Sequence, residues 1–110
     1  MSLNFKNFQE INSERNKIAY DGDCVLCTPS QWLQALVGEL GEYANFRKKF
    51  ERKSISEDTF LTEAKKELAD VVCYLFLLAS SLDIDLESAT IDKFNEVSDR
   101  IGSPIKIKEN

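Results

Sequence analysis

The sequence predicts an all-α fold, a bundle of four helices, and three observations support that prediction. The chain has only four glycines and two prolines among its 110 residues, and it is rich in leucine, glutamate and lysine, which are good helix formers. Apolar residues recur three and four positions apart in four successive segments, which is the period of an amphipathic helix. The connections between these segments are short, as is usual in helical bundles.

Composition and charge indicate a globular domain and argue against nucleic acid polymers and anionic membranes as partners. With 43% hydrophobic and 30% charged residues, the chain suits one globular domain over residues 1–110. Its net charge of −5 provides no long-range attraction for nucleic acid polymers or anionic membranes. A small anionic substrate stays compatible with this charge, because a bound cation reverses the local field. The N-terminus has no apolar signal core and the apolar run at 71–79 is too short for a bilayer, so we expect a cytoplasmic protein.

The first helix is expected over residues 3–19, where apolar side chains recur at helical spacing. Three polar residues, Asn12, Arg15 and Asn16, lie on or beside its apolar stripe. They fit either an ordinary helix edge or polar groups that reach a substrate from a neighbouring helix. A loop is expected at residues 20–27, where an Asp-Gly-Asp sequence marks a turn.

The second helix begins with a strong local signal. Thr28 is a good N-cap and Gln31 completes a capping box, and the helix is expected to run to about Lys53. Gly38 and Gly41 lie in its middle, where each glycine weakens a helix by about 1 kcal/mol relative to alanine. Such positions indicate either the close approach of another backbone or a ligand, or ordinary tight helix packing.

The third helix is expected from Glu57 to Leu82, and its second half is apolar on every side at residues 71–79. A helix that is apolar all round is normally buried all round. A chain of this length can hardly surround it, so we expect an oligomer with this helix at the interface. The fourth helix is expected at residues 86–101, with Asp85 as its N-cap and a Gly-Ser-Pro sequence to end it.

Two acidic pairs are the most distinctive feature of the chain. Glu39 with Glu42, and Glu67 with Asp70, are each spaced three residues apart and therefore share one face of a helix. Acidic pairs of this kind usually mark a solvated face. Here, however, Glu39 and Glu67 fall among the apolar residues that a helix normally buries, where an uncompensated carboxylate is costly. A hard cation such as Mg²⁺ takes oxygen ligands and keeps waters for substrate phosphates, so the pattern predicts a Mg²⁺ site between two helices.

The lack of histidine and the small number of cysteines argue against metal sites built from imidazole or thiolate ligands. The chain has no histidine, which removes imidazole from catalysis and from metal binding. Its three cysteines are an odd number, which fits a reducing compartment. Cys24 and Cys27 have the spacing of half a zinc site, but no second pair completes it, so we expect ordinary thiols in a loop.

The order of these motifs resembles a known family over about Phe5 to Ile107. The residues that carry the resemblance are Trp32, the segment Gly38-Glu39-Leu40-Gly41-Glu42, Asn45, Lys48-Lys49, the segment 67–75, Asp83-Ile84-Asp85-Leu86 and Lys93-Phe94-Asn95. In this order and separation they look like the MazG-type nucleotide pyrophosphohydrolases of the all-α NTP pyrophosphatase superfamily, near the dCTP pyrophosphatase branch.

The resemblance implies Mg²⁺-dependent hydrolysis of (deoxy)nucleoside triphosphates to a nucleoside monophosphate and pyrophosphate. It also implies an active unit that is at least a dimer, often a tetramer of two dimers. By position in the motifs, the metal ligands and catalytic residues would be Glu39, Glu42, Glu67 and Asp70. Tyr74 would lie near the nucleotide, and Lys93 and Asn95 would contribute to substrate binding from the fourth helix.

One departure and several alternatives accompany this expectation. The family pattern begins with two adjacent acids, whereas Gly38 stands at the first of these positions, which leaves the general base unassigned. Two roles are open for the basic cluster late in the second helix, which either meets the triphosphate or opposes the helix dipole; its residues are Lys48, Lys49 and Arg52. Trp32 either stacks on a base or belongs to the core. The competing function is a non-catalytic, oligomeric helical interaction module whose acidic pairs are structural.

Overall fold

The computed structural model describes residues 3–19 and 28–108. These residues form four α-helices and no strand, namely α1 (Phe5–Ala19), α2 (Pro29–Glu51), α3 (Glu57–Ser81) and α4 (Leu86–Ile101). The expected all-α fold is confirmed, and each helix boundary lies within two residues of its predicted position. The expected loop at 20–27, with Cys24 and Cys27, lies outside the described residues.

Local capping chemistry explains these boundaries. At the start of α2, the Gln31 backbone N–H donates to Thr28 Oγ1 (3.2 Å) and the Thr28 backbone N–H donates to Gln31 Oε1 (3.3 Å), which is the predicted capping box. Ser56 and Asp85 accept hydrogen bonds in the same way at the starts of α3 and α4. Gly102 ends α4 with a φ of 73°, a left-handed conformation that glycine adopts without a Cβ clash.

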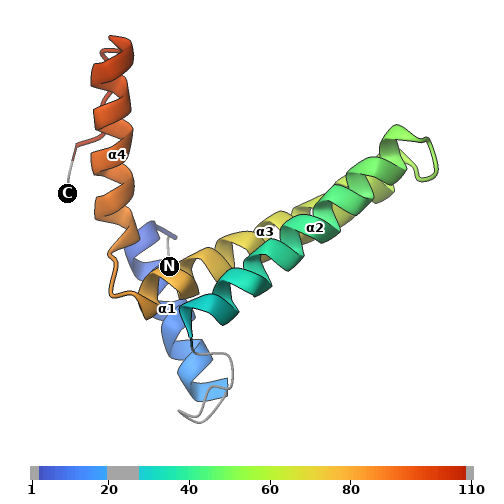
Figure 1. Cartoon of the computed structure of the whole chain (residues 1–110), viewed down its shortest axis with the longest axis horizontal. Helices are drawn as coiled ribbons and strands as arrows, with labels where there is room; N and C mark the ends of the chain where they lie inside the picture. Colours follow the sequence, from blue (N-terminus) through green and yellow to red (C-terminus); the bar gives the residue numbers. More distant parts are fainter. Residues whose placement is uncertain (1–2, 20–27, 109–110) are drawn as a thin grey trace.

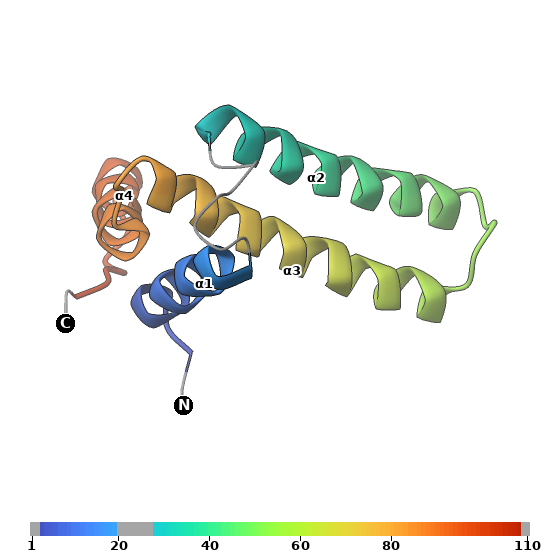
Figure 2. The same ribbon diagram turned by 90° about the horizontal axis from the view of Figure 1, so that it is seen from below.

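The helices are arranged around one long hairpin. Helices α2 and α3 run antiparallel and side by side along their whole length, and the connection at 52–56 joins them (Figures 1 and 2). Helix α1 packs on the side of α3 that faces away from α2, and α4 projects from the same end of the hairpin to the opposite side from α1. The radius of gyration is 16.9 Å, against about 13 Å for a compact domain of this length, so the arrangement is open.

Aromatic side chains of α2 and α3 pack against one another at two levels of the hairpin. At the end near α1, Trp32 is buried and its ring centroid lies 6.1 Å from that of Tyr74. Toward the connection, Phe50 stacks on the buried ring of Phe60 at 4.8 Å, and Tyr43 contacts the same ring at 6.1 Å. The middle of the hairpin is therefore held firmly from both ends.

A buried hydrogen bond and an aromatic contact attach α1 to α3. The Asn12 amide is only 3% exposed and its Nδ2 donates to the Cys73 carbonyl oxygen at 2.9 Å. Phe5 and Phe8 both pack edge-on against Phe76, with ring centroids 5.3 and 5.0 Å apart. Asn12 therefore lies inside the α1–α3 contact, so of its two alternatives the ordinary helix edge is wrong for this residue.

The apolar half of α3 is only partly covered within one chain. Phe76, Leu77 and Ala79 are buried, whereas Val72 and Leu75 are exposed. This partial cover agrees with the expectation that a chain of this length cannot surround the segment. Among the described residues, no helix is long and apolar enough to cross a membrane.

Candidate metal centre

Three of the four predicted acids meet in the middle of the hairpin. One carboxylate oxygen from each of Glu39, Glu67 and Asp70 lies within 4.8 Å of the others. The antiparallel pairing explains this meeting, because Glu39 lies 13 positions before the connection at 52–56 (52 − 39) and Glu67 lies 11 positions after it (67 − 56). Residues at similar distances from the turn of a hairpin come to about the same level. The predicted convergence of the two motifs is therefore seen for these three side chains.

The acids span the depth of the hairpin. Glu67 is buried at 8% exposure, Glu39 is half-buried, and Asp70 is exposed. Glu42 is exposed one turn after Glu39, and it is not part of the group of three. The cluster therefore runs from the α2–α3 contact to the surface.

The acids perturb one another. Hydrogen bonding and charge repulsion with Glu67 raise the pKa of Glu42 above its ordinary value. A hydrogen bond with Glu39, together with burial and the charges of Glu39 and Asp70, raises the pKa of Glu67. Glu42 thus belongs to the cluster electrostatically, and both groups release their protons less readily than an isolated glutamate does.

Two carboxylate oxygens of the cluster lack a hydrogen-bond partner among the residues that the structure describes. Glu39 Oε2 and Glu67 Oε2 are buried and accept no hydrogen bond from the described residues. More than about 90% of buried polar groups in native proteins are paired, and an unpaired buried carboxylate oxygen is especially costly.

Within residues 3–19 and 28–108, no basic side chain forms an ion pair with these oxygens. The ion pairs within the described part of the chain join other residues, namely Arg47–Glu51, Lys66–Glu63, Lys93–Glu96 and Lys106–Asp99. An all-oxygen donor set with uncompensated negative charge suits a hard cation such as Mg²⁺. The residues present therefore fit the predicted metal.

The predicted substrate residues on the hairpin lie on both sides of the acids. Tyr74 is half-buried one turn beyond Asp70 and contacts the buried Trp32, so the structure places Trp32 in the core. Lys48, Lys49 and Arg52 lie in and just after the last turns of α2, roughly 14 to 20 Å along the helix axis from Glu39 at 1.5 Å per residue. Lys49 Nζ lies over the Phe46 ring at 5.5 Å, and the other two cations are exposed.

The predicted substrate residues on α4 lie apart from the acids of the same chain (Figure 1). Lys93 is exposed and pairs with Glu96 at 3.4 Å. The Asn95 side chain donates to the Ile107 carbonyl oxygen at 2.7 Å and accepts from the Ile107 backbone N–H at 2.8 Å. Within one chain, Asn95 therefore holds the C-terminal segment against α4.

The two glycines beside the acids face open space. A Cβ atom added at Gly38 or Gly41 would meet nothing within 4 Å. Tight packing between the described helices of one chain therefore does not account for these glycines. The alternative, that a ligand or a second chain approaches them, stays a prediction.

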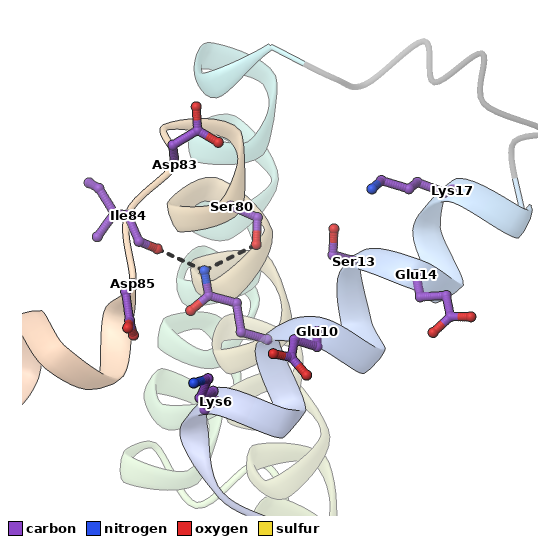
Figure 3. Close-up of a pocket in the computed structure, with 10 residues that line it drawn as sticks. Lys6, Glu10, Ser13, Glu14, Lys17, Ser80, Asp83, Ile84 and Asp85 are labelled. Carbon is purple, nitrogen blue, oxygen red and sulfur yellow. Dashed lines mark hydrogen bonds between the residues drawn. The ribbon is translucent and has the colours of Figure 1, made fainter. Parts of the chain in front are cut away.

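Sequence reasoning missed a groove between α1 and the α3–α4 turn (Figure 3). It has a volume of about 740 Å³ and mixes acidic and basic side chains, which are Glu10, Glu14, Asp83, Asp85, Lys6 and Lys17. On its wall, Gln9 Nε2 donates to Ser80 Oγ (3.2 Å) and to the Ile84 carbonyl oxygen (2.8 Å), and Gln9 Oε1 accepts from the Leu86 N–H (3.1 Å). These hydrogen bonds join α1 to the turn, and none of the predicted site residues lies there.

Comparison of the chain with protein-family models, with curated proteins and with solved structures gives no match. The candidate function therefore depends on the geometry of the acidic cluster and on the motifs that led to it.

Proposed function

We propose that this chain is a Mg²⁺-dependent nucleoside triphosphate pyrophosphohydrolase that produces a nucleoside monophosphate and pyrophosphate. The observation that supports it most is the pair of buried, unpartnered oxygens of Glu39 and Glu67 within the three-acid cluster. The motif order adds support, because the resemblance to the MazG-type enzymes assigns the metal to the same acids.

In this proposal, Glu39, Glu67 and Asp70 hold Mg²⁺, and Glu42 lies at the rim of the site. Bound there, Mg²⁺ would supply the positive charge that neutralises substrate phosphate oxygens. The aromatic contacts on either side hold α2 against α3, so the inner carboxylates are positioned before substrate arrives. The exposed carboxylates of Asp70 and Glu42 open the site to solvent, where a triphosphate can approach.

The remaining chemistry requires few groups. Hydrolysis of a phosphoryl bond depends mainly on positioning and on charge stabilisation, so the absence of histidine is no obstacle. One of the four carboxylates can orient the attacking water and accept its proton. Lys48, Lys49 and Arg52 add positive charge on the hairpin for the triphosphate.

The proposal also includes a homodimer or homotetramer. Lys93 and Asn95 lie on α4, away from the acids of their own chain. They can meet a nucleotide bound at the acids only if a second copy brings its α4 to the site, and Asn95 must then exchange its contact with Ile107 for the substrate.

A non-catalytic helical interaction module is the second candidate. The many exposed apolar side chains of the hairpin favour it, because large exposed apolar patches mark interaction surfaces. It leaves the unpartnered oxygens of Glu39 and Glu67 without an explanation, which is why we favour the enzyme.

Incubation of the purified full chain with a panel of ribo- and deoxyribonucleoside triphosphates tests the proposal. We expect monophosphate and pyrophosphate in Mg²⁺ and no products in EDTA. The variant Glu39→Gln should lose turnover, whereas Glu63→Gln, which removes a charge outside the cluster, should retain it. Diphosphate with phosphate as products would indicate a different hydrolase, and no turnover with any nucleotide would favour the interaction module.

A further inference from the structure

Helix α4 has little support from the rest of its own chain. It projects away from the hairpin, and its main contact is with α1 (Figure 1). The ion pairs of α4 within the described residues, Lys93–Glu96 and Lys106–Asp99, stay on α4 and the C-terminal segment. The direction of α4 therefore depends mainly on the backbone of the short connection at 82–85, which leads into it from α3.

The first part of this connection is fixed to α3. The Ile84 N–H donates to the Ala79 carbonyl oxygen (2.9 Å), and the Asp83 N–H donates to the Ser80 carbonyl oxygen (3.1 Å). Asp83 has a φ of 55°, the left-handed conformation that this type of helix end requires. The backbone is therefore held on α3 as far as the Ile84 N–H.

The remaining freedom lies at Asp85, the N-cap of α4, which has a φ of −78° and a ψ of 101°. Because peptide groups are planar, rotation about the two backbone single bonds of Asp85 turns α4 relative to the peptide group that begins with the Ile84 carbonyl. The Asp85 side chain accepts from the Ser88 N–H (3.3 Å). This bond lies within α4 and moves with it, so it does not hold α4 against α3.

The Gln9 carboxamide, from α1, holds both peptide groups that flank Asp85. Its Nε2 donates to the Ile84 carbonyl oxygen (2.8 Å), and its Oε1 accepts from the Leu86 N–H (3.1 Å). The same Nε2 donates to Ser80 Oγ on α3 (3.2 Å). One side chain therefore links the end of α3, the connection and the first residue of α4, and it restrains both backbone torsion angles of Asp85.

Open space lies beside this junction. The groove of about 740 Å³ has residues 83–85 along one side and Ser13, Glu14 and Lys17 of α1 along the other (Figure 3). It leaves room for the connection to move when its hydrogen bonds to Gln9 are absent. These hydrogen bonds, rather than close packing on the groove side, therefore hold the connection in place.

We propose that Gln9 is a positioning residue that sets the direction of α4 and, through it, the places of Lys93 and Asn95. Without the Gln9 hydrogen bonds, rotation at Asp85 lets α4 take a range of directions. The consequence for catalysis rests on the proposed function, in which Lys93 and Asn95 bind the nucleotide. Gln9 is not part of the acidic cluster, so it acts on the reaction only through α4.

Residual dipolar couplings of the backbone amides in the full chain test this inference, because they measure the directions of all helices in one frame. In the wild type, the couplings of α3 and α4 should fit one alignment tensor. In Gln9→Ala, the α3 couplings should still fit, whereas those of α4 should be averaged toward smaller values. Gln9→Glu should loosen α4 as well, with helical circular dichroism retained, because it keeps the size of the side chain but places an oxygen against the Ile84 carbonyl.

Two matched controls on α1 should keep the wild-type couplings of α4. Glu10→Gln changes a neighbouring residue of the same groove, and Asn12→Ala removes the hydrogen bond between α1 and the Cys73 carbonyl. An α4 that keeps its wild-type couplings in both Gln9 variants would overturn the inference. Equal loosening of α4 in Asn12→Ala would also overturn it, because α4 would then respond to any weakening of the α1–α3 contact.

Kinetics test the consequence for catalysis. In Gln9→Ala, kcat/KM for nucleoside triphosphates should fall about 100-fold, which is the effect of misplacing a group by about 1 Å, and Glu10→Gln should retain it. The response of thermal melts to Mg²⁺ should stay at the wild-type level, because the acids lie on α2 and α3. Gln9→Ala should cost much less in a Lys93→Ala background, since the two changes affect one contact; full additivity would refute action through α4. The couplings are measured without nucleotide, so a wild type without turnover would remove the proposed function, while a loosened α4 in the Gln9 variants would still support the role of Gln9.

Discussion

Replacing Glu67 with glutamine keeps the shape of the most buried acid in the cluster and removes its charge. If the cluster holds Mg²⁺, this change removes one of three converging oxygen ligands. Side chains that only orient metal ligands already contribute about 10- to 100-fold in affinity, so the loss of a ligand should weaken Mg²⁺ binding by about 100-fold or more. Turnover should fall by orders of magnitude with it.

Thermal melts measure the weakened Mg²⁺ binding independently of activity. Mg²⁺ at 100 times its dissociation constant stabilises a native protein by about 2.7 kcal/mol, which corresponds to about 10 to 20 °C in Tm for a small domain. A variant with 100-fold weaker binding is then near its dissociation constant and gains only about 2 to 3 °C. In EDTA the variant should be at least as stable as the wild type, because the cluster raises the pKa of Glu67 and so disfavours its charged form.

The assay is a set of thermal melts in EDTA and in a Mg²⁺ series, beside turnover of the same samples. Glu63→Gln is the matched control, because Glu63 lies one turn earlier on α3 and its ion-pair partner is Lys66. This control should show the wild-type response to Mg²⁺. A Glu67→Gln protein that keeps the wild-type response and turnover but is markedly less stable in EDTA would refute the metal centre and favour structural acids.

Three further predictions follow from the described residues. The pKa values of Glu42 and Glu67 are raised in the metal-free fold above the ordinary value of 4.5. At a pH between 4.5 and the raised values, the folded protein therefore binds more protons than the unfolded chain does. These groups should therefore make the metal-free protein more stable as pH falls from neutral toward 4.5, and saturating Mg²⁺ should abolish that gain in melts across this range. Gly38→Ala should raise stability by about 1 kcal/mol, since its Cβ meets nothing within 4 Å. An unchanged Tm would contradict this, and lost turnover in a stabilised variant would indicate a ligand close to the backbone. Asn12→Ala should cost about 1 to 2 kcal/mol in urea unfolding, because it removes the buried hydrogen bond to Cys73, and an unchanged midpoint would contradict that role.

The sequence predicted the helices well because their ends are decided locally. The capping box at Thr28, the cap at Asp85 and the left-handed Gly102 each depend on a few adjacent residues. Once the hairpin is assumed, the sequence also indicates that Glu39 and Glu67 meet at about the same level, because they lie at similar distances from the connection, 13 positions before it (52 − 39) and 11 after it (67 − 56).

Contacts between distant segments were not predictable in this way. Asn12 reads as a polar residue at a helix edge, yet it is buried because a backbone carbonyl of α3 lies opposite it. Asn95 satisfies both of its polar atoms on the backbone of Ile107, a pairing that depends on how the C-terminal segment turns back along α4. The direction in which α4 projects likewise depends on its junction with α1 through Gln9, which no local pattern marks.

Exposed leucines directly follow the two inner acids of the cluster, and this arrangement would connect the proposed assembly to metal binding. In both motifs a glutamate that faces the opposite helix is followed directly by an exposed leucine, Leu40 after Glu39 and Leu68 after Glu67. A second copy packed on these leucines would restrict rotation of α2 and α3 about their axes and so hold the two inner carboxylates in place. Val37 is exposed one turn before Leu40 on α2, so Val37→Glu should place a charge in such a contact and separate the copies. We therefore expect this variant to bind Mg²⁺ more weakly than the wild type, although Val37 lies outside the cluster. Melts in a Mg²⁺ series, with Ile18→Glu as the control, measure this difference, and a monomer with wild-type Mg²⁺ affinity would show that one hairpin alone positions the acids.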